Sequence, residues 1–315
     1  MEEKYLECLD GQTLEFIRHT EDFYPPDAVD ASIEKQREYY DALCVVFHLP
    51  YPEGVSATDL LINSPEYRIP VRHYEKAGDP PKARIMFFHG GGFVVGGLES
   101  HDSICAEFCG RTGMDVLAVD YRLAPEHVHP AAFNDCLHAY RHFAEKEETP
   151  FLLVGDSAGG TLAALVAHAC LDTGNAPIGQ LLIYPALGGN PSKGSYIDHA
   201  NAPMLTRADM EFYQAMRSGG KDLSDDPTAS PLAARDFRGL PPTVIVTAQC
   251  DPLADDGRHY CDAISAAGGK AVWFNEEGLV HGYLRARKTV KRAEESVTRM
   301  VECLKMLECC RWDFG

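Results

Sequence analysis

Short apolar segments recur along the chain and alternate with stretches of helical periodicity. Each segment is rich in Val, Ile, Leu or Phe and is apolar on both faces, which is typical of strands covered on both sides. Such strands, separated by helices, predict an α/β fold with a mostly parallel central sheet flanked by helices. The predicted strands are Ile85–Phe88, Val116–Val119, Phe151–Val154, Leu181–Tyr184, Val244–Thr247 and Ala271–Phe274.

The segments between these strands carry helix signals. Two of them end close to a glycine, Gly113 for the first and Gly268 for the second, and glycine is the residue that most readily ends a helix in the left-handed conformation. Near the start of the chain, Tyr67–Tyr74 alternates between apolar and polar residues, which predicts an antiparallel strand at the edge of the sheet. The predicted helices are Ser103–Arg111, Ala158–Cys170 and Leu253–Ala267.

Two regions do not follow the alternation. Residues 1–50 are polar and aromatic with helical stretches, and residues 188–229 are rich in Gly, Asn, Ser and Asp around the amphipathic segment Thr206–Met216. We expect both to pack over one end of the sheet as a helical cap. The core of the fold is then expected in residues 51–187 and 230–315, within a single unit that has no internal repeat.

Charge restricts the partners. The chain has 47 acidic and 29 basic residues, a net charge of −18 at pH 7. This charge repels phosphate backbones and anionic lipids, so we expect no nucleic acid partner and no stable membrane association. It also disfavours anionic substrates at low salt, unless the local field differs from the net one. No apolar run reaches the roughly 18–20 residues of a membrane span, and no signal peptide is recognisable, so a cytoplasmic protein is expected.

The eleven cysteines show no disulfide or zinc pattern. Their number is odd, and no CxxC or CxxH spacing occurs, so free thiols in a reducing compartment and no metal site are expected. His101, Cys105 and Cys109 would share one helix face, a spacing that is compatible with metal binding. Neighbouring Ile104 and Phe108 favour the interpretation that these cysteines pack as small hydrophobic residues.

The clearest chemical signal is Gly155-Asp156-Ser157-Ala158-Gly159, which lies directly between a predicted strand and a predicted helix. A G-x-S-x-G sequence in this context predicts a nucleophile elbow, a turn so sharp that only small residues fit around a strained serine. A Gly-rich turn of a nucleotide-binding fold is the alternative, but no second Gly-x-Gly sequence and no phosphate-binding Lys accompanies it. We therefore predict that Ser157 is a nucleophile.

A second glycine motif follows the strand Ile85–Phe88. Three consecutive glycines come after His89 and allow the backbone to turn its N–H groups outward and approach a ligand closely. Upstream of a nucleophile elbow, this arrangement predicts an oxyanion hole formed by the N–H groups of Gly91, Gly92 and Ala158. We expect His89 to anchor the loop.

A nucleophilic serine needs a base and an acid that orients the base. Asp251 follows the strand Val244–Thr247, and His281 follows the strand Ala271–Phe274 through a short acidic turn. Both positions lie where loops converge above the serine, and the order Ser, Asp, His fits this fold. The competing acids Asp255 and Asp256 fall inside the next helix, where we expect them to cap it or face solvent.

With these motifs, the sequence resembles the hormone-sensitive-lipase family of α/β-hydrolase carboxylesterases, of the bacterial short-chain type, over roughly residues 60–300. The resemblance implies the triad Ser157, Asp251 and His281, the oxyanion hole given above, a helical cap, and hydrolysis without metal or organic cofactor. The motifs that carry it are His89–Gly92 with Phe93, Asp120–Glu126, Gly155–Gly160, Tyr184-Pro185, Leu205–Arg207, Ser230–Leu232, Asp251–Leu253 and His281-Gly282.

The resemblance also implies a substrate class. Phe93 and Leu205 stand at family positions that wall the acyl or alcohol pocket, and a capped site predicts small-molecule esters with acyl chains of about two to eight carbons. Arg122 and Glu126 are expected to form a structural ion pair or to brace a loop. Homodimers are common in the family, so a homodimer is possible here.

Two alternatives remain. An amidase or deacetylase that acts on arylamides or acetylated small molecules would use the same residues. A receptor for small molecules, such as the gibberellin receptors that resemble this family, lacks the triad histidine. The presence of His281 disfavours that second interpretation.

Overall fold

The computed structural model describes residues 2–65, 67–78, 80–146, 148–171 and 173–314. Its centre is an eight-stranded sheet with the order β1-β2-β4-β3-β5-β6-β7-β8. The first two strands run antiparallel to their neighbours, and the pairs from β4–β3 to β7–β8 are parallel. The strands are β1 Val55–Asn63, β2 Arg68–Lys76, β3 Arg84–Phe88, β4 Asp115–Val119, β5 Phe151–Asp156, β6 Gly179–Ile183, β7 Thr243–Cys250 and β8 Ala271–Val280.

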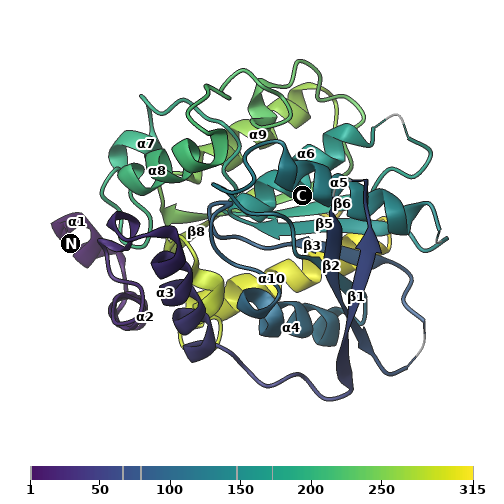
Figure 1. The fold of residues 1–315 in the computed structure, drawn as a ribbon, viewed down its shortest axis with the longest axis horizontal. Coiled ribbons are helices and arrows are strands. Elements are labelled where there is room, and N and C mark those ends of the chain that lie inside the picture. Colours follow the sequence, from purple (N-terminus) through teal and green to yellow (C-terminus); the bar gives the residue numbers. More distant parts are fainter. Residues whose placement is uncertain (1, 66, 79, 147, 172, 315) are drawn as a thin grey trace.

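Helices cover both faces of this sheet (Figure 1). Successive side chains of a strand point to opposite faces, and β3 shows the consequence. Ile85 and Phe87 pack in one apolar cluster with α4 and α10, whereas Met86 and Phe88 pack in another with α5, α6 and α9. The predicted α/β fold and its strands are thus confirmed. The covering helices are α4 Asp102–Thr112, α5 Ala131–Ala144, α6 Ala158–Ala169, α9 Ala254–Ala266 and α10 Lys291–Glu308.

The edge of the sheet differs from the prediction. The strand expected at the edge is β2, but β1 pairs outside it in antiparallel register from Val55↔Lys76 to Asn63↔Arg68. Only Ile62 of β1 is buried. With so few inward-facing apolar residues the strand has no hydrophobic alternation, and backbone pairing with β2 holds it in place.

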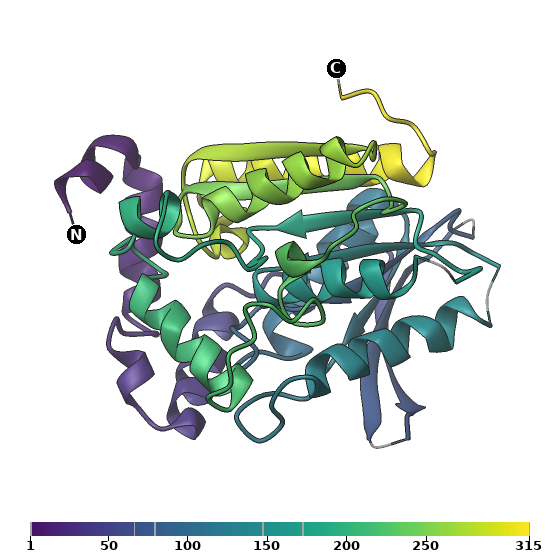
Figure 2. The same ribbon diagram turned by 90° about the horizontal axis from the view of Figure 1, so that it is seen from above.

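Helices from the two ends of the predicted cap lie side by side beyond the carboxyl ends of the parallel strands (Figure 2). The hydroxyls of Tyr24 and Tyr213 are hydrogen-bonded at 3.0 Å, and the Tyr5 hydroxyl lies 3.2 Å from His199 Nδ1. These contacts join the N-terminal region to the segment after β6. The helices are α1 Glu3–Cys8, α2 Gly11–Glu21, α3 Ile33–Val46, α7 Ser195–Asp198 and α8 Arg207–Ser218.

The C-terminal helix α10 packs against its own chain. Val297, Val301 and Leu304 of α10 are buried in the core of the same chain.

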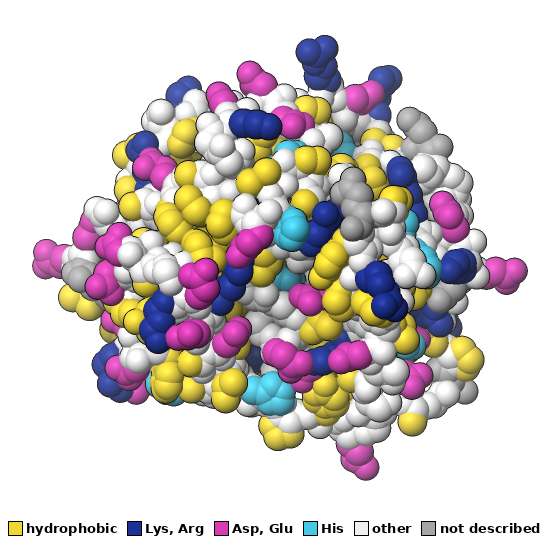
Figure 3. Space-filling model, in the orientation of Figure 1, with side chains coloured by type: hydrophobic (Ala, Val, Ile, Leu, Met, Phe, Trp, Pro, Cys, Tyr) yellow, Lys and Arg dark blue, Asp and Glu magenta, His cyan; other side chains and the backbone are white. Residues whose placement is uncertain are grey.

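Acidic side chains, with Lys and Arg among them, are distributed over the face seen in Figure 3. Within the described part of the chain, no helix combines the length and apolar character needed to cross a bilayer. Short 3₁₀ turns occupy Ala28–Asp30, Glu99–His101, Pro231–Ala233 and Tyr283–Ala286.

Candidate active site

Ser157 occupies the turn between β5 and α6. Its backbone has φ 53° and ψ −120°, a strained conformation for a residue with a side chain. The flanking glycines make this turn possible. A Cβ on Gly155 would lie 2.3 Å from the Gly159 carbonyl oxygen, and one on Gly159 would lie 1.9 Å from the Phe88 carbonyl oxygen. Any larger residue would push α6 away from the sheet, so the geometry is that of a nucleophile elbow.

The other two predicted residues meet Ser157 at the carboxyl edge of the sheet. Asp251 directly follows β7 and His281 directly follows β8. His281 Nδ1 donates to Asp251 Oδ2 at 2.7 Å, and the Ser157 hydroxyl lies 2.9 Å from His281 Nε2. Asp251 is fully buried, and its other oxygen accepts the Leu253 N–H at 2.9 Å. With Nδ1–H directed to the carboxylate, Nε2 is left as the acceptor that a serine nucleophile requires.

The predicted oxyanion donors surround the same serine. Gly91 and Gly92 have φ angles of 127° and 60°, and they turn the loop after β3 toward α6. Among the described residues, none accepts a hydrogen bond from the N–H of Gly91, Gly92 or Ala158. Three N–H groups are therefore available to a ligand at the start of α6, where the helix dipole favours negative charge.

Asp156, inside the motif itself, is a residue whose role sequence reasoning missed. Its buried carboxylate accepts the Gly90 N–H at 2.9 Å and lies 3.1 Å from His101 Nε2. Burial alone would raise its pKa, but the neighbouring His101, the charge of Arg285 and these hydrogen bonds lower the pKa of Asp156 to about 2. The ionised carboxylate thus ties the glycine loop to the elbow. In the sequence, only the position of Asp156 next to the serine could have indicated this role.

The flanks of the glycine loop are also braced. The His89 ring stacks on Tyr121 at 4.2 Å, and its Nδ1 donates to the Gly90 carbonyl at 2.8 Å. These contacts agree with the expected anchoring role. The predicted Arg122–Glu126 ion pair is wrong: Arg122 binds Asp135 at 2.8 Å, while Glu126 binds Arg37 of α3 at 2.7 Å. Both residues brace loops, but through partners far away in the sequence.

Asp256 corrects a second expectation. It is fully buried in α9, whereas a helix-capping or solvent-facing position was predicted. Its Oδ2 accepts the N–H of Leu187 at 2.7 Å, and also the N–H groups of Gly188 and Gly189 and the Tyr196 hydroxyl. Oδ1 has no partner among the described residues. Burial, only partly offset by these bonds, raises the pKa of Asp256 to about 6.

This burial gives a pH-dependent stability that a variant can isolate. A folded-state pKa near 6, above an unfolded value of about 4, gives stability that is present below about pH 4 and is lost as the pH rises through about 6. We expect the melting temperature of the wild type, minus that of Asp256→Asn, to fall between about pH 4 and pH 7 and to stay level above that. Asp255, whose pKa is lowered, provides the control, because Asp255→Asn should show no such fall. A constant difference for Asp256→Asn would contradict the assignment.

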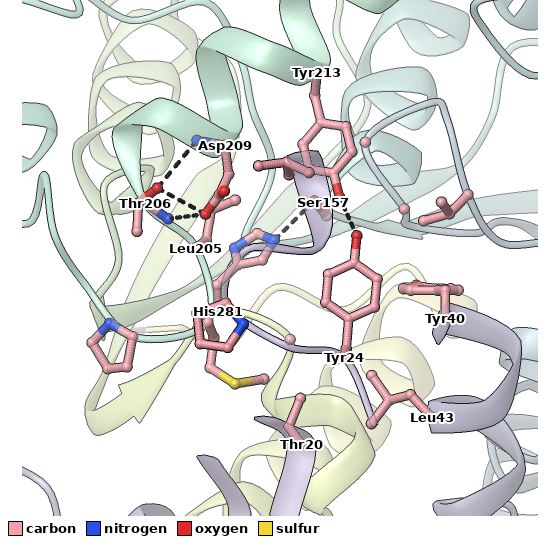
Figure 4. A pocket seen from close by; sticks show the side chains of 18 of the residues that line it. Thr20, Tyr24, Tyr40, Leu43, Ser157, Leu205, Thr206, Asp209, Tyr213 and His281 are labelled. Atoms are coloured by element: carbon pink, nitrogen blue, oxygen red, sulfur yellow. Dashed lines mark hydrogen bonds between the residues drawn. The ribbon is translucent and has the colours of Figure 1, made fainter. Parts of the chain in front are cut away.

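Two cavities meet at Ser157. One of ≈ 220 Å³ lies toward the N-terminal helices, and one of ≈ 620 Å³ lies along α8. Leu205 and Tyr213 line both cavities, whereas Phe93 lines only the larger. Figure 4 shows Tyr213 bonded to Tyr24 beside the serine and His281. The Tyr213 ring packs closely against the oxyanion loop, since a Cβ added to Gly92 would lie 2.5 Å from that ring.

The histidine and cysteine groups considered above form no metal site. Within the described residues, no group of three or more His, Cys, Asp or Glu side chains is arranged to hold a metal ion. Cys105 and Cys109 are buried in the apolar cluster of α4, as their neighbours suggested. The other histidines do not join the triad either: His168, for example, packs against Phe237 and Tyr260.

Comparison with known proteins places this geometry in a family. A family model described as the α/β-hydrolase fold matches residues 85–285. The chain is 35% identical to the carboxylic ester hydrolase LipN of Mycobacterium tuberculosis over 288 residues, 86% of this chain and 76% of that protein. It is 31% identical to the ethyl acetate hydrolase of Pseudomonas putida over 308 residues, 93% of this chain and 96% of that one.

A solved structure of an ester hydrolase also matches almost the whole chain. An ester hydrolase from the metagenome of Lake Arreo, in complex with a bipyridine phosphonate derivative, superposes with a TM-score of 0.87 at 30% identity and covers 94% of this chain and 98% of that one. The resemblance found in the motifs is therefore confirmed over almost the whole chain. The chain belongs to the α/β-hydrolase fold family, among the esterases that resemble hormone-sensitive lipase.

Proposed function

We propose that the protein is a serine carboxylesterase that hydrolyses small esters with short to medium acyl chains through a covalent acyl-enzyme. One observation carries the proposal: Ser157, His281 and Asp251 form a continuous hydrogen-bonded chain beside three unused N–H groups. Relatives named carboxylic ester hydrolase and ethyl acetate hydrolase support the ester as the substrate. The His281–Ser157 hydrogen bond argues against a purely binding role.

The reaction follows from this arrangement in two steps. His281 takes the proton of Ser157 as its oxygen attacks the ester carbonyl, and Asp251 stabilises the imidazolium that forms. The N–H groups of Gly91, Gly92 and Ala158 hold the oxyanion. His281 then protonates the leaving alcohol, and the acyl group stays on Ser157. In the second step His281 activates a water molecule, which releases the acid and restores the serine.

The helices of residues 1–50 and 188–229 act as the cap in this proposal. Residues 1–50 line only the smaller cavity, with Tyr24 among them, whereas residues 188–229 line both cavities, with Tyr213 in each. Phe93 and Leu205 then border the acyl and alcohol groups of the ester. In a capped site, such walls limit the length of the acyl chain that the site accepts.

A series of p-nitrophenyl esters from acetate to palmitate tests this proposal. We expect kcat/KM to peak between about two and eight acyl carbons, because cavities of ≈ 220 and ≈ 620 Å³ offer room for small substrates only. The measurement is initial rates of p-nitrophenol release with equal enzyme concentration throughout. Higher activity on an emulsified long-chain triglyceride than on a butyrate ester would contradict the predicted acyl range. A folded protein inactive on every ester would contradict the proposed function.

A further inference from the structure

A buried arginine lies in the wall of the larger cavity. Arg217, in the last turn of α8, is 7% exposed, and its guanidinium lies 3.9 Å from the centre of the Phe93 ring. Phe93 directly follows the oxyanion loop. Arg217, Phe93 and Ser157 line the same ≈ 620 Å³ cavity. A permanent cation thus stands beside the space in which a substrate would meet the serine.

This cation has no counterion within the part of the chain that the structure describes. No described residue accepts a hydrogen bond from the Arg217 side chain, and its Nη2 is buried without a partner. Asp226, whose charge acts on Arg217, forms no ion pair with it and instead lies 3.6 Å from His129 Nε2. By contrast, the guanidinium of Arg287, which is also buried, donates to Glu107 at 2.8 Å. An unpaired buried charge is costly, so its retention indicates a partner that is supplied from outside the chain.

The charge of Arg217 persists at neutral pH, and no other charge in the wall neutralises it. Burial lowers the pKa of Arg217 only to about 10, so the group is protonated near pH 7. Glu211 also lines the cavity, but it is exposed and paired with Arg207 at 2.8 Å. Lys221 and Asp222 are exposed at its rim and have opposite signs.

We propose that the larger cavity binds esters that carry a carboxylate, and that Arg217 pairs with this carboxylate during hydrolysis at Ser157. This inference rests on the proposed esterase function and names its substrate class. A guanidinium matches a carboxylate through two parallel N–H bonds, and stacking on Phe93 holds the Arg217 guanidinium in the cavity wall. The net charge of −18 predicts the opposite preference, but Arg217 places a cation in the wall of the cavity that contains the serine.

Matched substrate pairs test the proposal on the wild-type enzyme. Monoethyl adipate differs from ethyl hexanoate by a carboxylate in place of the terminal methyl of the acyl chain. The acetate ester of 4-hydroxybutanoate differs from butyl acetate in the same way on the alcohol side. Initial rates are measured by titrating the released acid at pH 7 in about 0.15 M salt, which weakens the repulsion by distant surface charges. We expect a higher kcat/KM for the anionic member of at least one pair. Equal or lower values in both pairs would overturn the proposal.

Two variants locate the effect. Arg217→Met keeps an unbranched side chain and removes the cation. It is expected to lower kcat/KM for the preferred anionic ester at least about tenfold and to change that for its neutral partner less than about threefold. Arg238→Met is the control, since it removes an exposed arginine that is paired with Asp236 and lines neither cavity. It should change the anionic-to-neutral ratio less than about twofold.

The outcomes separate this inference from the proposed function. An equal loss on both members of the pair would assign Arg217 a structural role and overturn the inference. A preference that survives Arg217→Met would also overturn it, because the anion would then bind elsewhere. If Arg217→Met does not fold, the wild-type comparison still decides. Failure of the proposed function looks different: the wild type would show no Ser157-dependent hydrolysis even of the neutral esters.

Discussion

Replacement of Ser157 by alanine is expected to lower kcat for short-chain esters by up to about 10⁶, the loss seen when a serine hydrolase loses its nucleophile. The alanine variant retains the oxyanion N–H groups and both cavities, so substrate binding and KM should change far less than kcat. It also keeps the helix start, because the strained turn depends on the flanking glycines and Ala is small enough for it. The residual rate would come from binding and oxyanion stabilisation alone.

The measurement is p-nitrophenyl butyrate hydrolysis by the wild type and Ser157→Ala side by side, with circular dichroism to confirm folding. Ser192→Ala serves as the control, because Ser192 lies exposed in the loop after β6. A fluorophosphonate probe gives an independent readout, since it should label the wild type and the control but leave Ser157→Ala unlabelled. A Ser157→Ala enzyme that keeps more than about a hundredth of the wild-type kcat would refute the nucleophile assignment.

Asp251→Asn is expected to lower kcat by about 10⁴, as the equivalent change does in serine proteases. Asparagine has nearly the same shape, and its carbonyl oxygen can still accept the Leu253 N–H that Asp251 binds at 2.9 Å. Its amide would then face His281 Nδ1 and donate to it. This forces the proton of the imidazole onto Nε2, which can no longer accept the proton of Ser157. The loss should therefore fall on kcat, with the fold intact.

Asp255→Asn is the matched control for this prediction. Asp255 is the next acid along the chain, and its carboxylate accepts the Ser195 N–H and pairs with Arg258 at 2.9 Å. Neither contact involves His281. The kcat of Asp255→Asn should therefore stay within about threefold of the wild type. Equal losses in both variants would show that the region needs its acids for structure. A large loss in Asp255→Asn alone would move the triad acid to that position.

Local sequence patterns predict much of the fold and of the candidate active site. A strand buried on both faces appears in the sequence as an unbroken apolar run, and a sharp strand-to-helix turn accepts only small residues. A few neighbouring residues therefore predict β5, α6 and the position of Ser157. Asp251 and His281 followed from one further rule. Parallel strands end at the same edge of a sheet, and each residue comes directly after such a strand.

Tertiary structure decided what depends on partners far away in the sequence. β1 has too few buried residues to show an alternation, and its place at the sheet edge comes from backbone pairing with β2. The sequence predicts Asp256 as a capping or exposed acid of a helix, but the loop after β6 covers it and donates backbone N–H groups to it. The support that His101 gives Asp156 across 55 residues, and the unpaired state of Arg217 over Phe93, have no local signal at all.

The sequence by itself therefore determined the fold class, the elbow, the oxyanion loop and the candidate triad, because steric limits and burial periodicity act between near neighbours in the chain. Only the tertiary structure decided which polar groups became buried, which partner each one found, and how residues from distant segments line two cavities at one serine. Burial and pairing set the free energy of a charge, and both are properties of the three-dimensional neighbourhood. For that reason the substrate preference inferred from Arg217 became visible only in the folded chain.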